Sequence, residues 1–90
     1  MAHPIIKVHS TSEFEKSFRH LPVEIQGLAV KKDLLFRQDA FALRLRTHKL
    51  RGELEGYWAY SVNGHYRVLF RFLNENEVVY YDIGTHDIYQ

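Results

Sequence analysis

The sequence predicts an α+β fold, because the two halves of the chain show different hydrophobic periodicities. The first half has a short β-type run followed by apolar residues at helical spacing, whereas the second half is rich in aromatic and β-branched residues. Asn63-Gly64 lies between two of these β-type segments and is typical of a hairpin turn. With 90 residues, of which 46% are hydrophobic, the chain is expected to form one domain over residues 1–90.

A strand and two helices are expected first. Ile5–His9 is a short β-type run and predicts a strand. Residues 10–12 offer hydroxyl side chains for an N-cap, and two phenylalanines four residues apart then share one helical face. Pro22 suits the first turn of a second helix, which the apolar spacing extends to about Gln38.

The rest of the chain is expected to form an antiparallel meander, so the whole sheet is predicted to be small and antiparallel. Leu43–Arg46 alternates apolar and basic residues and is predicted to be a short extended piece. Gly52 and Gly56 bracket a turn. The three strands of the meander are predicted at Tyr57–Val62, His65–Phe72 and Val78–Ile83, with a two-residue turn at Asn63-Gly64 and a longer one at Leu73–Glu77.

Positive charge is concentrated in the middle of the chain. Residues 44–71 contain six Lys/Arg and two Glu, a net charge of +4, although the whole chain carries only +1. Residues 72–90 contain four acidic residues and no Lys or Arg. A local basic cluster favours contact with nucleic acid more than the total charge does, although such a cluster is also common on a solvated face.

The composition argues against several classes of protein. The sequence has no cysteine, so disulfides and thiolate metal sites are excluded. No apolar run reaches the roughly 20 residues of a membrane span, and residues 1–8 are too short and too interrupted for a signal peptide. No pair of histidines has the i, i+4 spacing of helical metal ligands, so neither a metal nor another cofactor is expected. A cytoplasmic location is expected.

Alternation along the predicted strand His65–Phe72 separates two faces. The apolar face, which is expected to pack on the helices, contains Tyr66, Val68, Phe70 and Phe72. The opposite face contains His65, Arg67, Leu69 and Arg71, provided that the strand has no bulge. Ionisable side chains are therefore expected where a ligand could lie.

Several short motifs occur in a recognisable order: His48-Lys49-Leu50-Arg51-Gly52, then Gly56-Tyr57, and finally Ile83-Gly84-Thr85-His86. Together with the predicted elements they resemble the RelE/ParE superfamily of bacterial toxins from type II toxin–antitoxin pairs, and within it the ribosome-associated mRNA interferases related to YafQ. The resemblance implies a sheet with two helices packed on one face. It also implies an endoribonuclease that cleaves mRNA in the ribosomal A site, and a cognate antitoxin as partner. The free toxin is expected to be a monomer that forms a hetero-oligomer with the antitoxin.

The same resemblance implies the residues of the active site. His48 and His86 correspond to the catalytic histidines of YafQ-type enzymes, and Arg67 corresponds to an arginine that binds the scissile phosphate in RelE-type members. The chain departs from the YafQ pattern on the hairpin, where a histidine and an aspartate are replaced by Ser61 and His65. His65 is therefore a candidate substitute for the missing hairpin acid.

Metal-independent RNA cleavage needs a base, an acid and cations that stabilise the charge developing on phosphorus. His48 and His86 are expected to share the acid and base roles. Tyr89 is a candidate for stacking on a base or orienting a phosphate. Further basic residues are expected to bind RNA, namely Arg44, Arg46, Lys49 and Arg51, of which Arg51 is the second choice for the scissile phosphate.

Other interpretations remain open at this point. The histidines could be ordinary surface residues, Tyr89 could pack the C-terminus, and Arg67 could form salt bridges with Glu53 or Glu55. Tyr57 is expected in the core, whereas Trp58 could be a core residue or a stacking platform. Two other functions compete with the enzyme: a ParE-like toxin that binds DNA gyrase, and a weakly active remnant that mainly binds its antitoxin.

Overall fold

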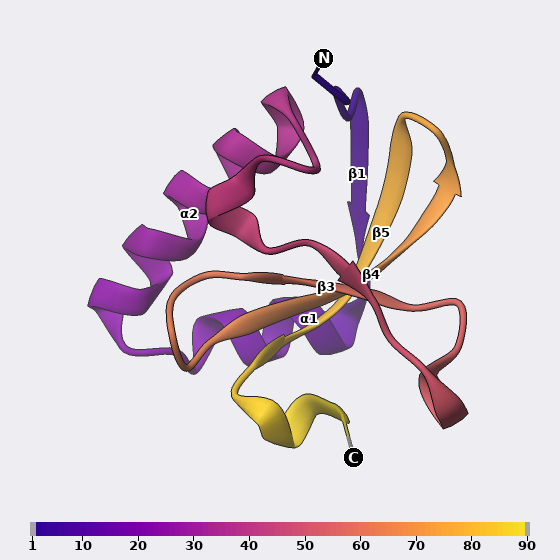
Figure 1. The fold of residues 1–90 in the computed structure, drawn as a ribbon. Coiled ribbons are helices and arrows are strands. Elements are labelled where there is room, and N and C mark those ends of the chain that lie inside the picture. Colours follow the sequence, from indigo (N-terminus) through magenta and orange to yellow (C-terminus); the bar gives the residue numbers. More distant parts are fainter. Residues whose placement is uncertain (1, 90) are drawn as a thin grey trace.

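A computed structural model describes residues 2–89, and the two ends of the predicted domain, Met1 and Gln90, lie outside the described residues. Within them, two helices and five strands, one strand more than predicted, form a fold of the predicted α+β class (Figure 1). The elements follow the order β1 (Lys7–Ser10), α1 (Ser12–Arg19), α2 (Val23–Gln38), β2 (His48–Lys49), β3 (Trp58–Ser61), β4 (Arg67–Asn74) and β5 (Glu77–Gly84). No helix among residues 2–89 is long and apolar enough to cross a membrane.

The sheet has the strand order β1-β5-β4-β3-β2. Strands β2 to β5 form the expected antiparallel meander, but β1 pairs in parallel with β5, so the sheet is mixed and the prediction of an antiparallel sheet is wrong for this strand. The parallel pairing follows from the long connection between these two strands, since the helices and the rest of the meander lie between them in the chain. The two-residue edge strand β2 was not predicted, because it is too short to show alternation.

Both helices begin near the predicted positions. The Thr11 side chain caps α1 by accepting a hydrogen bond from the Phe14 backbone N–H at 3.0 Å. Two glutamates in the first turn and two basic residues in the last turn complement the helix dipole. Pro22 lies at the N-cap of α2, which ends at Gln38 as expected.

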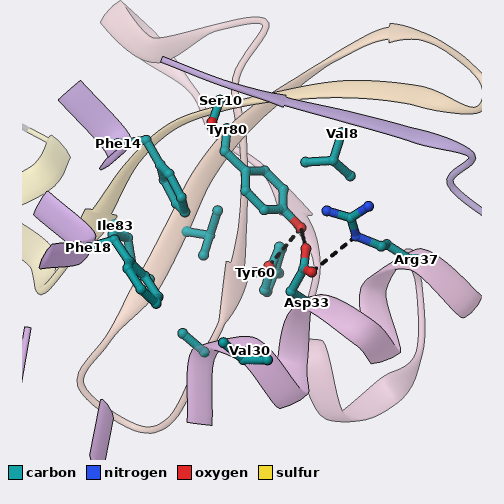
Figure 2. A pocket seen from close by; sticks show the side chains of 12 residues that line it. Val8, Ser10, Phe14, Phe18, Val30, Asp33, Arg37, Tyr60, Tyr80 and Ile83 are labelled. Atoms are coloured by element: carbon teal, nitrogen blue, oxygen red, sulfur yellow. Dashed lines mark hydrogen bonds and ion pairs between the residues drawn. The ribbon is translucent and has the colours of Figure 1, made fainter. Parts of the chain in front are cut away.

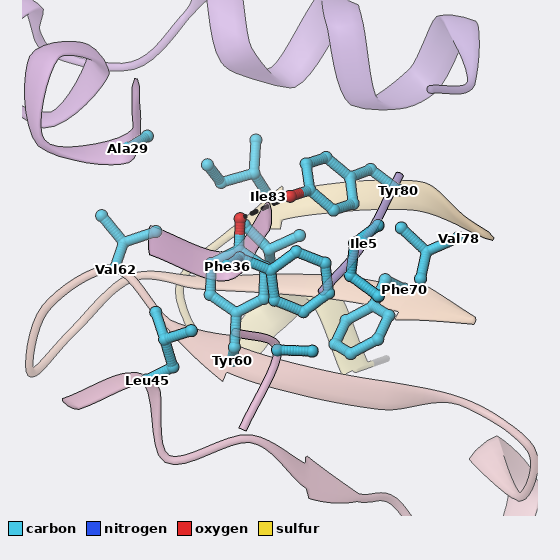
Figure 3. Packing of buried hydrophobic residues seen from close by; sticks show 12 residues of the cluster. Ile5, Ala29, Phe36, Leu45, Tyr60, Val62, Phe70, Val78, Tyr80 and Ile83 are labelled. Carbon is cyan, nitrogen blue, oxygen red and sulfur yellow. Dashed lines mark hydrogen bonds between the residues drawn. The ribbon is translucent and has the colours of Figure 1, made fainter. Parts of the chain in front are cut away.

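The core lies between the helices and one face of the sheet, as the resemblance implied. Phe36 of α2 is fully buried and stacks on Tyr60 with ring centroids 4.6 Å apart (Figure 3). It also meets Phe70 edge-on at 4.9 Å, and Phe14 of α1 contacts Tyr80 at 5.2 Å. These aromatic contacts join both helices to the three central strands.

A hydrogen-bonded chain of polar groups crosses this core. The Tyr60 hydroxyl donates to the Tyr80 hydroxyl at 2.9 Å, which donates to Asp33 Oδ1 at 2.7 Å. Arg37 Nε donates to the other carboxylate oxygen at 3.0 Å (Figure 2). Burial is the main cause that raises the pKa of both tyrosines above the usual range, so both hydroxyls stay neutral donors. The chain of bonds satisfies polar groups that burial would otherwise leave unpaired.

Replacing Tyr80 with phenylalanine is expected to lower the free energy of unfolding by about 1–3 kcal/mol. The change removes the acceptor of the buried Tyr60 hydroxyl and the donor to Asp33, while the ring remains in place. Urea denaturation followed by circular dichroism measures the loss. Tyr81→Phe is the matched control, because the Tyr81 hydroxyl makes no hydrogen bond within residues 2–89. Equal stability of the two variants would contradict this account of the core.

Two local predictions were wrong. Leu43–Leu45 forms a 3₁₀ turn instead of an extended piece, because only Leu45 enters the core while Leu43 is 95% exposed. Arg46 then adopts a left-handed conformation, with φ of 50°. The hairpin loop contains three residues instead of two, because the Val62 N–H donates to the carbonyl oxygen of Tyr66. Inside the loop, the Asn63 side chain accepts hydrogen bonds from the backbone N–H groups of His65 and Tyr66.

Candidate functional site

The sheet face opposite the helices is termed the open face. Val68 and Phe70 of β4 are buried in the core, so Arg67, Leu69 and Arg71 project from the other side, as predicted. The register between β4 and β5 does shift, since Leu69 pairs with Asp82 and Phe70 with Tyr80. The extra residue belongs to β5, so the alternation of β4 is preserved through Phe72.

Arg67 and His86 form a direct pair on this face. Arg67 Nη1 lies 2.9 Å from His86 Nε2, although the two residues are 19 positions apart in the chain. A guanidinium group only donates, so His86 Nε2 accepts and a neutral His86 carries its proton on Nδ1. Within residues 2–89 no carboxylate forms a salt bridge with Arg67, so the alternative pairing with Glu53 or Glu55 is wrong.

The C-terminal 3₁₀ turn, His86–Tyr89, places two predicted residues together. The rings of His86 and Tyr89 meet edge-on with centroids 5.8 Å apart. The Tyr89 hydroxyl is buried and has no hydrogen-bond partner among the described residues. Burial raises the pKa of Tyr89, and the positive charge of Arg67 partly opposes this shift. The turn therefore holds an unpaired hydroxyl beside the Arg67–His86 pair.

Gly84 allows this turn to lie close to the sheet. Gly84 pairs with Arg67 across the β4–β5 ladder, and a Cβ atom built at Gly84 would lie 2.7 Å from Ile88 Cγ2. A side chain at this position would push the C-terminal turn away from the open face. The glycine of the Gly84-Thr85-His86 motif thus has a packing role that helps to position His86 and Tyr89.

His48 lies on the same face but on the edge strand β2. It pairs with Ala59 of β3, which pairs with Leu69 of β4, so these residues share the open face. His48 Nδ1 lies 2.8 Å from the carbonyl oxygen of Arg46, which fixes the proton of a neutral ring on Nδ1. Nε2 then faces solvent as a proton acceptor. Two strand spacings, about 10 Å in total, separate the backbones of β2 and β4, the strand that carries Arg67.

The predicted RNA-binding residues are all exposed: Arg44, Arg46, Lys49 and Arg51. A hollow beside β2 is lined by His48 and the segment that follows it through Gly52, together with Glu55, Gly56 and Trp58. Lys49 Nζ lies 5.5 Å from the centre of the Trp58 ring, a cation–π contact. Trp58 packs against the core and also lines the hollow, so its packing is compatible with both alternatives left open for this residue.

Two predictions about site residues were wrong in position. His65 lies in the hairpin loop, because β4 begins only at Arg67, and it is exposed there instead of projecting from the strand. Its backbone N–H is held by the Asn63 side chain at 2.8 Å. Tyr57 does not belong to the core but contacts Arg71, which was correctly predicted on the open face, and Tyr81, for which no role was predicted. Contacts between residues so far apart in the chain leave no signal in local sequence patterns.

A second concave region lies on the helix-covered side of the sheet. A cavity of about 210 Å³ between the helices and the sheet is lined mainly by apolar residues and contains none of the predicted catalytic residues (Figure 2). Within residues 2–89, no three His, Asp or Glu side chains lie close enough together to form a metal-binding group.

Comparisons with known proteins bear on this arrangement. No family model matches the sequence, and no curated protein matches it significantly. Solved structures do match: the toxin–antitoxin complex RelBE2 from Mycobacterium tuberculosis has a chain with a TM-score of 0.76 and 22% identity, over 92% of this chain and 93% of that one. The chain has the fold of RelE-type toxins. The YoeB/ParE toxin from Agrobacterium tumefaciens has a TM-score of 0.74 and 14% identity, over 90% of this chain and 99% of that one.

The same RelE-type fold occurs in YafQ from Escherichia coli, with a TM-score of 0.66 and 15% identity, over 91% of this chain and 94% of that one. These structures confirm the architecture that the sequence motifs suggested. At such low identity they identify the fold alone. The proposed roles of individual residues in this chain therefore rest on the geometry of its own open face.

Proposed function

We propose that this chain is the toxin of a type II toxin–antitoxin pair and acts as a ribosome-associated mRNA endoribonuclease without a metal. The observation that carries the proposal is the Arg67–His86 pair beside the unpaired Tyr89 hydroxyl, on the same open face as His48. The proposed toxin is a cytoplasmic, single-domain protein.

The proposed reaction begins with attack of an RNA 2′-hydroxyl on the adjacent phosphorus. A base removes the proton of this hydroxyl, and an acid protonates the departing 5′-oxygen, so the products are a 2′,3′-cyclic phosphate and a 5′-hydroxyl. His48, whose Nε2 faces solvent, and His86 share these two roles. The scissile phosphate replaces His86 as the acceptor of Arg67, which leaves the imidazole available for proton transfer and places a fixed positive charge on the phosphate.

The proposed partners are mRNA in the ribosomal A site and an antitoxin. The antitoxin is supported by the similarity to the toxin chain of the RelBE2 toxin–antitoxin complex. It is also consistent with three exposed apolar side chains of α2, Val23, Val30 and Leu34, which are 77%, 51% and 57% exposed. A monomeric free toxin and a hetero-oligomer with the antitoxin are proposed on the same basis.

Primer-extension mapping of cellular mRNA after brief induction tests the proposal. Wild type should produce cuts within translated codons, and Arg67→Lys should reduce their rate about tenfold, because lysine keeps the charge but loses one of two charge-assisted hydrogen bonds, roughly 1.5 kcal/mol. Arg19→Lys is the matched control, since Arg19 is exposed on α1 and lies outside the site. Growth arrest without RNA cuts would favour the gyrase-binding function, and neither arrest nor cuts would favour an antitoxin-binding remnant.

A further inference from the structure

A second group of side chains on the open face has no role in the chemistry proposed above. Arg71 Cζ lies 5.3 Å from the centre of the Tyr57 ring, and the Tyr57 ring meets Tyr81 edge-on at 5.2 Å and 73°. Arg71 comes from β4, Tyr81 from β5, and Tyr57 immediately precedes β3. Three neighbouring strands thus build one cluster of two aromatic rings and one cation.

The N–H groups of the Arg71 guanidinium are free to donate hydrogen bonds. Within residues 2–89 it forms neither a salt bridge nor a hydrogen bond, and the residue is exposed. Its planar fork is suited to bidentate contact with a phosphate group. Gly56 lies against it with φ of +93°, and a Cβ there would lie 3.8 Å from Arg71 Nη2. The guanidinium is therefore held by the cation–π contact with Tyr57 while its donors remain available.

This cluster is separate from the proposed reaction centre. Arg67 and Arg71 are four residues apart on one strand, so their Cα atoms lie about 14 Å apart along β4. Their guanidinium groups are held by different partners, His86 in one case and Tyr57 in the other. Between them, Leu69 forms an apolar floor that is only 7% exposed. A single phosphate cannot occupy both forks in this arrangement.

We propose that Tyr57, Arg71 and Tyr81 form a second RNA subsite, which binds a nucleotide on one side of the scissile phosphate in a single strand. Arg71 binds the phosphate of that nucleotide, and the exposed parts of the aromatic rings stack on its base. Stacking on aromatic side chains tolerates any base, so the subsite fixes the position of the strand more than its sequence. This inference rests on the proposed RNA cleavage, because it describes how the same open face holds its substrate.

Binding of an uncleavable RNA tests the subsite. The probe is a short, fluorescently labelled single-stranded RNA with a 2′-O-methyl group on every nucleotide, which removes the attacking hydroxyl. Fluorescence anisotropy gives its Kd for wild type, Tyr57→Leu and Arg71→Gln. Each variant should bind roughly tenfold more weakly. Arg19→Gln is the control for loss of one exposed charge and should bind within about twofold of wild type, after correction for salt-dependent electrostatics.

Conservative variants separate the subsite from bulk charge and from misfolding. Arg71→Lys should still lose several-fold in affinity, because lysine lacks the planar fork. Tyr57→Phe should bind close to wild type, because the ring is kept. Wild-type affinity in Arg71→Lys would overturn the proposal in favour of simple charge attraction, and so would wild-type affinity in both Tyr57→Leu and Arg71→Gln.

Kinetics distinguish this proposal from the proposed function. With cleavable RNA, Tyr57→Leu should raise KM while kcat changes little, since the residue holds a flanking nucleotide. A lower kcat with unchanged KM would overturn the assignment. If wild type binds the uncleavable RNA through this cluster but cleaves nothing, the endoribonuclease fails and the subsite stands. If wild type cleaves RNA but neither Tyr57→Leu nor Arg71→Gln changes KM, the subsite fails and the endoribonuclease stands.

Discussion

Replacing His86 with alanine is expected to lower the rate of RNA cleavage by about 10² to 10⁴-fold, the usual contribution of a positioned acid or base. The change also removes the acceptor that holds Arg67 at 2.9 Å and the edge-on neighbour of Tyr89. The rate is measured on purified protein with translating ribosomes and a defined mRNA, at saturating substrate. Most of the loss should appear in kcat, because a proton-transfer group acts mainly in the transition state.

Two controls show whether the loss is chemical. His20→Ala removes an imidazole at the end of α1, where its Nδ1 lies near the carbonyl oxygen of Lys16, and it should cleave RNA like wild type. The thermal midpoint of His86→Ala should stay close to wild type, since His86 is exposed. Full cleavage by His86→Ala would refute the acid–base role and leave the Arg67–His86 contact as a surface interaction.

A second alanine at His48 tests whether the two histidines act in one step. If one is the base and the other the acid of the same reaction, the double variant should be little worse than the slower single variant. Independent, multiplicative losses would indicate that His48 mainly binds RNA, as its exposed position beside the basic hollow also permits.

Local features of the fold were predictable from the sequence. Thr11 and the acidic first turn define the start of α1, and the two faces of β4 follow from alternation. These features depend on residues close together in the chain. The parallel pairing of β1 with β5 depends on contacts about 70 residues apart, such as Val8 with Val78, and no local pattern reports such a pairing.

In the candidate site, too, individual residues were predictable from the sequence, whereas the contacts between distant residues were not. The motifs identified His48, Arg67 and His86, but the contact between Arg67 and His86 depends on how the C-terminal turn folds over Gly84. The wrong position of His65 follows from the Asn63 side chain, which closes a three-residue loop in place of the expected tight turn. Arg71 was correctly placed on the open face, yet its partner Tyr57 was expected in the core because a tyrosine on a small sheet is usually buried.

Replacing Phe36 with alanine is expected to cost about 3–5 kcal/mol of stability, the usual range for a fully buried phenylalanine. A chain of 90 residues typically has only about 5–13 kcal/mol in total, so the variant should be marginally stable or unfolded. The loss is large because Phe36 contacts Tyr60, Phe70 and Tyr80 and thus joins α2 to three strands. Urea denaturation measures it.

Phe41→Ala is the matched control for this change. Phe41 is 42% exposed and packs on Trp58 and Phe72 at the rim of the core, so the same truncation leaves a smaller cavity and should cost clearly less. Equal losses would contradict the central position of Phe36.

Because the same strands carry Arg67 and Arg71 on their other face, Phe36→Ala should lose RNA cleavage in proportion to the fraction unfolded, whereas His86→Ala should lose it while folded. Measuring activity against the folded fraction therefore distinguishes the structural role of Phe36 from the proposed catalytic role of His86.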